Sequence, residues 1–412
     1  MPDNGMTMAS PGNQTAFSDD AVPLDLLRER AFNLRWAQQP PDVIPLTAAD
    51  PDFPVCPAIR EELIRYVSDG VLSYAPAEGL PRYREAVAEW INTSRQIECG
   101  ASSIFATDSA ASGMAVIARA SLQSGDEVLI TDPVDFLFQH TVERTGAIAV
   151  RVPVTPTTTA EEFISGMANR LTPRTRMLWL CNPHNPLGMV YSREWLRPVS
   201  EWAISKGLRI LSDEIWADII YSPHRHVSVA SLSPEIARNT VTVYGFSKNF
   251  ALAGLRVGCV ICTHPEWLKD IVATSDAAST VYGVSVLSQI AVIAAVTHGR
   301  PWLNEFVGHL HRQRDFVLER LSRWPGVTVR PPEGTYVVFP YINKLDDDAE
   351  RFCGVLHEQA RVALVPGAPR WFGPGARGHV RICFATSHAI LQEAFERMDP
   401  VVMRLSEQRS LR

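Results

Sequence analysis

Short apolar runs alternate with stretches of helical character from about residue 100 onward. The apolar runs lie at residues 128–130, 147–152, 177–181, 208–214, 240–246 and 255–263. Between two of them, Ser192 precedes a helical stretch that continues to Lys206 and ends at Gly207, which fits a serine N-cap and a glycine after the last turn. Parallel strands that are buried on both faces and joined by crossover helices have this pattern. The sequence therefore predicts an α/β protein with a mostly parallel sheet.

The C-terminal part follows a different pattern. A helical stretch begins near Val284, breaks at residues 299–301 and resumes as a second helix to Arg323. Strand-like runs follow at 327–332, 335–342, 362–367 and 379–385, with helical stretches at 347–359 and 387–405. This mixture predicts a smaller α+β domain. We expect a leader and joining segment at 1–47, a large domain at 48–298 and a small domain at 299–412.

Composition excludes several classes of protein. With 46% hydrophobic and 20% charged residues, the 412-residue chain can bury sizeable cores. The net charge of −6 gives no reason to expect nucleic acid as a partner, and the lack of an apolar run of about eighteen residues gives none to expect a membrane span. The polar first twenty residues do not resemble a signal peptide, and seven scattered cysteines favour reduced thiols. We expect a cytoplasmic protein with no metal site, and solvent-exposed histidines at His224 and His226.

Lysine is rare in this chain, so chemistry that needs a primary amine has few candidates. The four lysines are Lys206, Lys248, Lys269 and Lys344. Three of them have the context of surface residues, whereas Lys248 directly follows a predicted strand. Because ligand sites of α/β sheets lie at the carboxyl ends of the strands, Lys248 is the candidate for a functional amine.

Two further segments end predicted strands in the same way. Asn185 lies in the segment 182–188, Asp213 lies in the segment 212–215, and Arg256 follows Lys248 by eight residues. An amine, a carboxylate, an amide and a guanidinium therefore converge on one edge of the sheet. A pyridoxal 5′-phosphate site needs this set: a lysine for the Schiff base, an acid for the pyridine nitrogen, an amide for the ring oxygen and a cation for the phosphate.

The motifs resemble those of fold-type I pyridoxal-phosphate enzymes of the aminotransferase class I/II group. The resemblance runs from about Ala48 to Met398 and is narrower to the MalY/PatB-type C–S β-lyases, which are cystathionine β-lyase-like. It rests on the segments 49–54, 73–74, 181–188, 212–218, 247–255 and 381–386. The resemblance implies a large domain with a mostly parallel sheet, a smaller α+β domain and a homodimer with shared active sites.

Roles follow from the resemblance residue by residue. Lys248 is expected to form the Schiff base and to move the proton at the substrate Cα, and Asp213 to pair with the pyridine nitrogen. Asn185 is expected to donate to the ring hydroxyl and contact the substrate, and Arg256 to bind the phosphate with help from Ser247. Three more residues have expected roles. Tyr74 is expected to reach the neighbouring subunit's phosphate, Arg381 to bind the substrate carboxylate, and Tyr336 to approach the substrate.

The chain departs from the family pattern around the cofactor. The turn that opens the phosphate-binding helix contains Ser109, Ala110 and Ala111, which leaves backbone N–H groups as the main donors. Asp135 stands where the family has an aromatic residue that stacks on the ring, with Phe136 next to it. Trp216 stands where relatives have tyrosine or histidine, and an indole can donate but not accept. We interpret these changes as a retuned cofactor site.

The residues leave the reaction open. The resemblance favours C–S β-elimination from a cysteine S-conjugate or a cystathionine-like amino acid, in specialised or antibiotic metabolism. The alternative is an aminotransferase, and a third reading is decarboxylation-linked oxidative deamination of a cysteine S-conjugate. A regulatory or binding protein on the same scaffold is the non-enzyme alternative, although a mere binder needs neither Lys248 nor Asp213.

Overall fold

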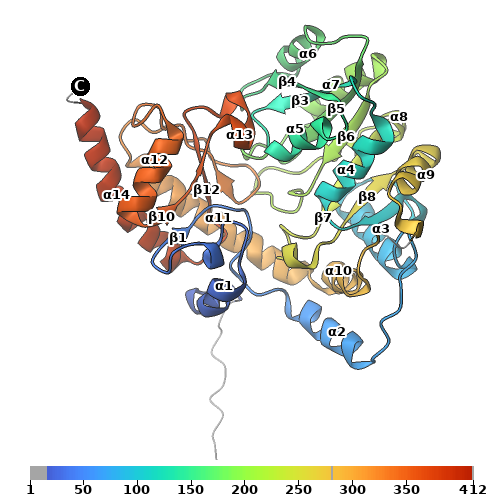
Figure 1. The fold of residues 1–412 in the computed structure, drawn as a ribbon, viewed down its shortest axis with the longest axis horizontal. Coiled ribbons are helices and arrows are strands. Elements are labelled where there is room, and N and C mark those ends of the chain that lie inside the picture. Colours follow the sequence, from blue (N-terminus) through green and yellow to red (C-terminus); the bar gives the residue numbers. More distant parts are fainter. Residues whose placement is uncertain (1–15, 280–281, 411–412) are drawn as a thin grey trace, which may run out of the picture.

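A seven-stranded sheet forms the centre of the larger part of the molecule (Figure 1). The computed structural model describes residues 16–279 and 282–410. Across the sheet the strands are β2 (Ile104–Thr107), β8 (Gly258–Cys262), β7 (Thr240–Gly245), β6 (Arg209–Asp213), β5 (Thr175–Cys181), β3 (Glu127–Asp132) and β4 (Ile148–Pro153). The five strands from β7 to β4 are all parallel, so the predicted α/β class with a mostly parallel sheet is confirmed.

Strand β8 runs antiparallel to both of its neighbours, β7 and β2. The chain between β7 and β8 holds one turn of 3₁₀ helix, η5 (Ala253–Leu255), and no crossover helix. A parallel return needs a crossover of a dozen or more residues, usually a helix, so the short connection sends β8 back in the opposite direction. This connection contains Lys248.

Helices cover both faces of the sheet. They are α4 (Ala110–Ser121), α5 (Phe136–Glu143), α6 (Ala160–Ala168), α7 (Arg193–Ser205), α8 (Pro234–Arg238) and α9 (Pro265–Thr274). Along β5, Met177 and Trp179 belong to one apolar core, while Leu178 and Leu180 belong to a second core on the opposite face. This alternation is what a strand buried on both faces requires. The predicted helix after Ser192 is confirmed, since the Ser192 hydroxyl accepts from the Trp195 N–H at the start of α7.

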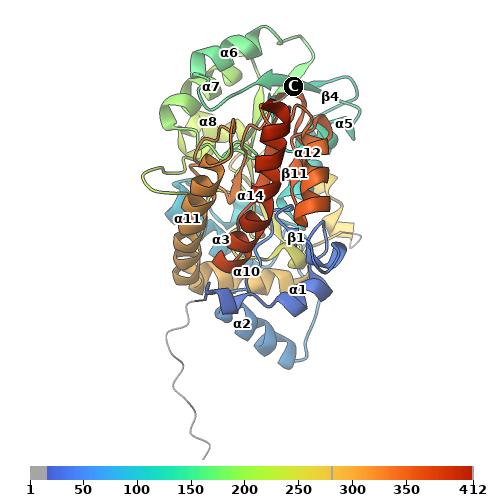
Figure 2. The same ribbon diagram turned by 90° about the vertical axis from the view of Figure 1, so that its left-hand side faces the viewer.

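The C-terminal part packs long helices against a small sheet (Figure 2). Its helices are α10 (Val286–His298), α11 (Arg300–Ser322), α12 (Ala349–Val355), α13 (Pro369–Phe372) and α14 (His388–Ser410), and its three-stranded sheet has the order β11 (Val365–Pro366), β12 (Val380–Cys383), β9 (Val337–Val338). The strand expected at 327–332 is reduced to an isolated bridge between Thr328 and Tyr341. Pro331 and Pro332 lack the N–H groups that a longer ladder would need.

The N-terminal residues reach both parts of the molecule. Helix α1 (Leu24–Arg30) leads to β1 (Ile44–Pro45), which pairs in parallel with β10 (Val362–Ala363) of the C-terminal part. Helices α2 (Pro57–Ser68) and α3 (Pro81–Arg95) both pack against α10. The division of the chain after residues 47 and 298 stays a prediction.

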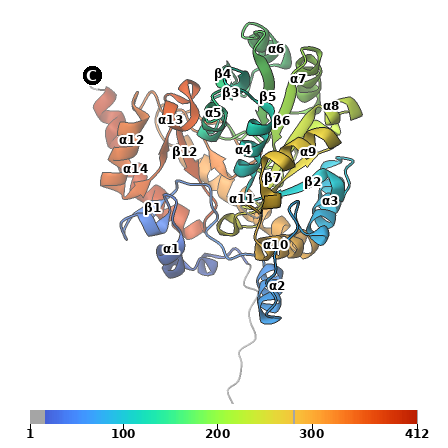
Figure 3. The ribbon, with the colours of Figure 1, turned by 45° about the vertical axis from the view of Figure 1, so that its right-hand side comes forward.

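None of the described helices has the length and apolar character that crossing a bilayer requires. The remaining helical elements are short turns. The turns are η1 (Asp19–Ala21), η2 (Trp36–Gln38), η3 (Ala101–Ser103), η4 (Val229–Ser231), η6 (Ala277–Ser279), the π-helical η7 (Leu356–Ala360) and η8 (Pro374–Ala376). Figures 1 and 3 both place α13 beside α5, so the small sheet meets the large one near the carboxyl ends of β3 and β5.

Candidate active site

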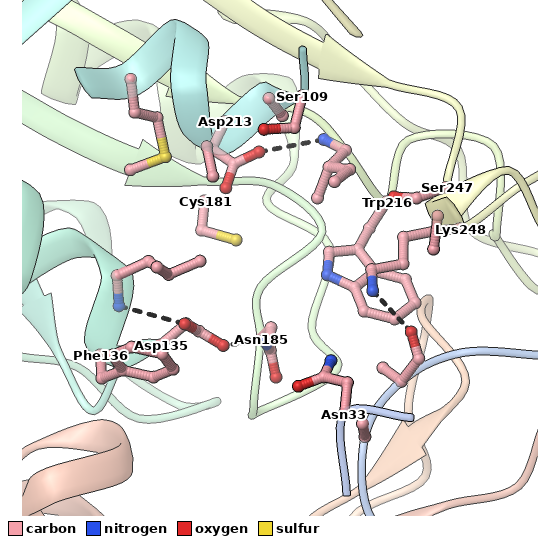
Figure 4. Close-up of a pocket in the computed structure, with 18 of the residues that line it drawn as sticks. Asn33, Ser109, Asp135, Phe136, Cys181, Asn185, Asp213, Trp216, Ser247 and Lys248 are labelled. Carbon is pink, nitrogen blue, oxygen red and sulfur yellow. Dashed lines mark hydrogen bonds between the residues drawn. The ribbon is translucent and has the colours of Figure 1, made fainter. Parts of the chain in front are cut away.

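A cavity of about 330 Å³ opens where the two parts of the molecule meet (Figure 4). Most of the predicted site residues line it: Ser109, Ala110, Ala111, Phe136, Asn185, Asp213, Trp216, Ser247, Lys248, Arg256 and Arg381. We call Ser109–Ala111, Asp213, Lys248 and Arg256 the floor of the cavity, because they follow or adjoin strands of the large sheet. We call Asp135, Asn185 and Arg381 its wall, because there the large sheet meets β12.

Lys248 lies in the connection after β7 and projects into the cavity (Figure 4). Its Nζ donates to the backbone oxygen of Ala49 at 2.5 Å and lies 5.5 Å from the centre of the Trp216 ring. Removal from water lowers the pKa of this amine, although the neighbouring carboxyl of Asp50 acts in the opposite direction. A lowered pKa increases the unprotonated fraction, and only the unprotonated amine is a nucleophile.

Asp213 is the last residue of β6 and is almost fully buried. Its Oδ1 accepts from the Ile215 N–H at 3.1 Å, an interaction drawn in Figure 4. Burial raises the pKa of this carboxyl to about 7, and the nearby carboxyls of Asp135 and Glu214 contribute in the same direction. A cation placed against Asp213 would stabilise its ionised form, so the site suits a protonated ring nitrogen.

The N-terminus of α4 forms the anion-binding end of the floor. Ser109 caps the helix in a reciprocal pair with Ser112, and Arg256 donates to the Ser109 hydroxyl at 3.2 Å. A helix start presents unpaired N–H groups and a positive partial charge to an anion. Gly258 of β8 allows this approach, because a Cβ there would lie 2.7 Å from the Ala110 nitrogen.

Three side chains form a hydrogen-bonded chain along the wall. Asn185 donates through Nδ2 to Asp135 Oδ2 at 3.0 Å and accepts through Oδ1 from Arg381 at 3.2 Å. Arg381 also donates to the Thr47 oxygen, and its guanidinium lies 5.1 Å from the centre of the Phe372 ring. Its Nε is buried and has no hydrogen-bond partner within the described residues. The Arg381 side chain itself lines the cavity, so its guanidinium can meet a ligand there.

Asp135 reaches the wall because it starts a helix. It is the N-cap of α5, and its Oδ1 accepts from the Leu137 N–H at 3.1 Å. Phe136, the first residue of the helix, is 39% exposed and packs edge-on against Trp371 at 5.8 Å. Two neighbouring residues thus lie where the family has one stacking aromatic residue. The Asp135 carboxylate contacts Asn185, and the Phe136 ring lines the cavity beside Trp371. Whether Phe136 stacks on a bound ring stays a prediction.

Three other expected roles also remain predictions. Trp216 is buried in the lining and packs edge-on against Tyr336 at 4.6 Å. Tyr336 is fully buried behind it, donates to the Ala49 oxygen at 3.2 Å and is not one of the lining residues. Tyr74 is 91% exposed and is likewise not one of the lining residues of its own chain.

Sequence reasoning missed two features of the site. The backbone oxygen of Ala49 accepts from both Lys248 and Tyr336, and a backbone atom leaves no mark in a residue pattern. The expected exposure of His226 is wrong: its side chain is buried and its Nε2 lies 3.0 Å from Glu214 Oε2. Loop composition indicated exposure, but a buried carboxylate next to Asp213 needs a partner and draws the histidine inward.

The donor set fits pyridoxal 5′-phosphate. The cavity offers an amine for the aldehyde, an acid for the ring nitrogen, and a helix start with Arg256 for the phosphate. It also holds the guanidinium of Arg381, a cation that suits a substrate carboxylate. Its volume lies within the usual range for small-molecule sites of about 300–1,000 Å³.

Comparison with known proteins identifies the family. A family model described as aminotransferase class I and II matches residues 41–398. The probable aspartate/prephenate aminotransferase of Aquifex aeolicus is 33% identical over 363 residues, which cover 87% of this chain and 90% of that protein. An aromatic aminotransferase structure from Pyrococcus horikoshii has a TM-score of 0.81 at 30% identity, and the match covers 89% of this chain and 97% of that one. Cystalysin from Treponema denticola has a TM-score of 0.85 and 22% identity, covering 92% and 97%, which shows the fold alone.

These comparisons correct the expected main activity. C–S β-elimination is wrong as the first reading, because relatives that are 30–33% identical are named as aspartate/prephenate, aspartate or aromatic aminotransferases. Elimination and transamination both begin with loss of the proton from Cα and need the same lysine, carboxylate and arginine. The motifs that suggested the lyase subgroup therefore do not separate the two reactions. The chain belongs to the class I and II aminotransferase family, has the fold-type I architecture of that family, and has pyridoxal 5′-phosphate as its cofactor.

Proposed function

We propose that this protein is an aminotransferase that moves the amino group of an α-amino acid to a 2-oxo acid. The named relatives at 30–33% identity support this reading. The observation that carries it is that Arg381 lines the same cavity as Lys248 and Asp213. A guanidinium suits a substrate carboxylate, and it brings Cα toward the amine.

We assign the floor residues to cofactor binding and proton transfer. The cofactor supplies an electron sink that acidifies the Cα–H bond of a bound amino acid. Lys248 would anchor the aldehyde and, once displaced by the substrate amine, would take the proton from Cα and return it two bonds away, to the cofactor carbon on the other side of the amino nitrogen. Asp213 keeps the ring nitrogen protonated through its negative charge. The N–H groups of Ala110 and Ala111 hold the phosphate together with Arg256, and Ser247 assists them.

We assign the wall to the substrate. Arg381 binds the α-carboxylate, and the amide of Asn185 orients the guanidinium through its Oδ1. The Asn185 nitrogen has a second hydrogen beyond the one donated to Asp135, which is available for the ring oxygen. Phe136 and Trp371 close the cavity on the side of the small domain.

We also propose a homodimer. Tyr74 follows Val71 and Leu72, which are 68% and 59% exposed, so a run of apolar side chains faces outward in a single chain. Covering such a run is favourable, and a second copy would bring Tyr74 toward the other subunit's phosphate end. Sedimentation velocity is expected to give the mass of two chains, and Tyr74→Phe is expected to weaken cofactor affinity without dissociating the dimer.

The test of the proposed function traces the amino nitrogen from the donor to the acceptor. Purified holoenzyme is incubated with a panel of nitrogen-labelled amino acids and a panel of 2-oxo acids that includes pyruvate and phenylpyruvate, and labelled product amino acids are measured by mass spectrometry. A labelled product amino acid that disappears in Lys248→Ala supports the proposal. Borohydride reduction followed by peptide mapping checks that the cofactor is attached at Lys248.

Two outcomes of that test contradict the proposal. Ammonia and carbon dioxide released with oxygen uptake, without any labelled product amino acid, would indicate oxidative deamination. A protein that leaves Lys248 unlabelled after borohydride, yet binds amino acids, would indicate the regulatory alternative.

A further inference from the structure

One charged side chain in the cavity has no place in the proposed chemistry. The charged residues of the lining are Asp135, Asp213, Lys248, Arg256 and Arg381. Four of these serve the cofactor or the α-carboxylate in the proposed function, on which this inference rests. Asp135 remains, and it is the carboxylate of the wall itself, one hydrogen bond from Asn185.

Asp135 is held in place from two sides. Its Oδ1 accepts from the Leu137 N–H and its Oδ2 from Asn185 Nδ2, so both oxygens act as acceptors. Asn185 in turn accepts from Arg381, which links the carboxylate to the group that binds the substrate. The negative charge of Asp135 is thus fixed close to any amino acid whose α-carboxylate lies on Arg381.

The remaining surface of this part of the cavity is mostly apolar, and the amide of Asn33 is its polar member (Figure 4). Its apolar members are Leu34, Val365, Phe136, Trp371 and Phe372. Among the lining residues, both guanidinium groups already have an anion to bind, namely the phosphate for Arg256 and the α-carboxylate for Arg381. A second carboxylate on the substrate would therefore meet Asp135, hydrocarbon and at most the neutral amide of Asn33, without a cation of its own.

We infer that Asp135 is a specificity-determining residue that excludes dicarboxylic amino acids and selects donors with uncharged, apolar or aromatic side chains. Two like charges a few ångströms apart repel strongly where water is partly excluded, and discrimination often uses such a repulsive element. An aromatic or branched aliphatic side chain meets no such penalty and gains contact with the apolar lining.

The test compares two carboxylic acids that lack an amino group. Calorimetry measures binding of 3-phenylpropionate and maleate to the holoenzyme, and kcat/KM is measured for L-phenylalanine and L-aspartate. The wild type is expected to prefer the phenyl ligand and donor. Asp135→Asn and Asp135→Ser, which both retain N-cap ability, are expected to shift the maleate-to-phenylpropionate affinity ratio toward maleate by about 10- to 100-fold.

The matched control is Glu143→Gln at the other end of α5. Glu143 is exposed and does not line the cavity, so the same loss of charge on the same helix is expected to leave the ratio unchanged. The inference is overturned if the wild type binds maleate as tightly as 3-phenylpropionate, or if neither Asp135 variant moves the ratio. If one Asp135 variant fails to fold, the other variant provides the test. The comparison of maleate with 3-phenylpropionate on the wild type needs neither variant.

Failure of the inference and failure of the proposed function can be told apart. Transfer of the label from L-aspartate to pyruvate as readily as from L-phenylalanine refutes the specificity but leaves the proposed aminotransferase activity standing. A preference for 3-phenylpropionate that Asp135→Asn abolishes, without transfer of the label from any donor to any 2-oxo acid, supports the selectivity of the wall and refutes the aminotransferase.

Discussion

The floor and the wall of the cavity are built in different ways. The floor comes from one sheet: Asp213 ends β6, Lys248 follows β7, and the start of α4 lies against Gly258 of β8. The wall needs β12 of the C-terminal part to bring Arg381 to Asn185, 196 residues away in the chain. Both regions keep most of the family pattern and each departs from it once: the floor at Ser109–Ala111, where the turn lacks the usual hydroxyl, and the wall at Asp135. In the proposed function the floor serves the chemistry common to the family and the wall selects the substrate.

The largest effect is expected at Lys248. In the proposed function, Lys248→Ala removes the anchor of the cofactor and the group that moves the Cα proton. The value of kcat/KM is expected to fall by about 10⁴-fold or more, the upper range for a general acid–base group. Steady-state kinetics with borohydride mapping checks this. Lys206→Ala, on the surface end of α7, serves as the control, and a Lys248→Ala enzyme that kept a tenth of its activity would break the assignment of the floor.

Asp213→Asn is expected to lower kcat by roughly 10²- to 10³-fold, because a preorganised charge against the ring nitrogen is lost. KM for the amino donor is expected to change little, since the wall is intact. If instead KM for the amino donor rose and kcat stayed unchanged, the assignment of chemistry to the floor and of substrate binding to the wall would be refuted.

The cofactor-free protein is expected to lose stability as pH rises. Burial raises the pKa of Asp213 to about 7 from an unfolded value near 3.8, so between these values the unfolded chain ionises at this residue while the folded chain does not. Folding is therefore penalised progressively across this window, by about 4 kcal/mol at most above it. Urea unfolding at pH 4 and pH 8 checks this. The penalty is expected to be absent from Asp213→Asn, and an equal pH dependence in both proteins contradicts the assignment.

At the wall, Arg381→Lys keeps the charge but loses the planar fork that binds a carboxylate in two places. KM is expected to rise by about 10- to 100-fold with little change in cofactor affinity. Titration of the cofactor-free variant with pyridoxal 5′-phosphate separates the two effects. A large loss of cofactor affinity would show that Arg381 belongs functionally to the floor.

The smallest effect is expected from the backbone contact beneath the phosphate end. A Cβ at position 258 would lie 2.7 Å from the Ala110 nitrogen and 2.8 Å from the Tyr244 oxygen. Gly258→Ala is expected to cost about 1–3 kcal/mol of stability, as overpacking does, and to weaken cofactor binding. Gly254→Ala, which meets nothing within 4 Å, is the matched control and should be neutral in thermal unfolding. Equal stability of the two variants would mean that the floor tolerates movement of α4.

The floor could be predicted because its signals are local. A short apolar run in the sequence indicates each strand. A polar residue at the carboxyl end of a parallel strand lies at the edge of the sheet. Asp213 and Lys248 therefore meet in space although 35 residues separate them in the numbering. The antiparallel course of β8 was not predicted, since its apolar run has the same composition as that of a parallel strand.

The amino-acid sequence alone determined the α/β class, the cofactor and the residues of the floor, because periodicity and strand-end chemistry act over a few residues. Only the tertiary structure decided that Asp135 holds Asn185, that Tyr336 turns away behind Trp216, and that the Ala49 oxygen receives Lys248. Those contacts join segments as much as 199 residues apart, and their partners are chosen by packing and burial rather than by any local pattern.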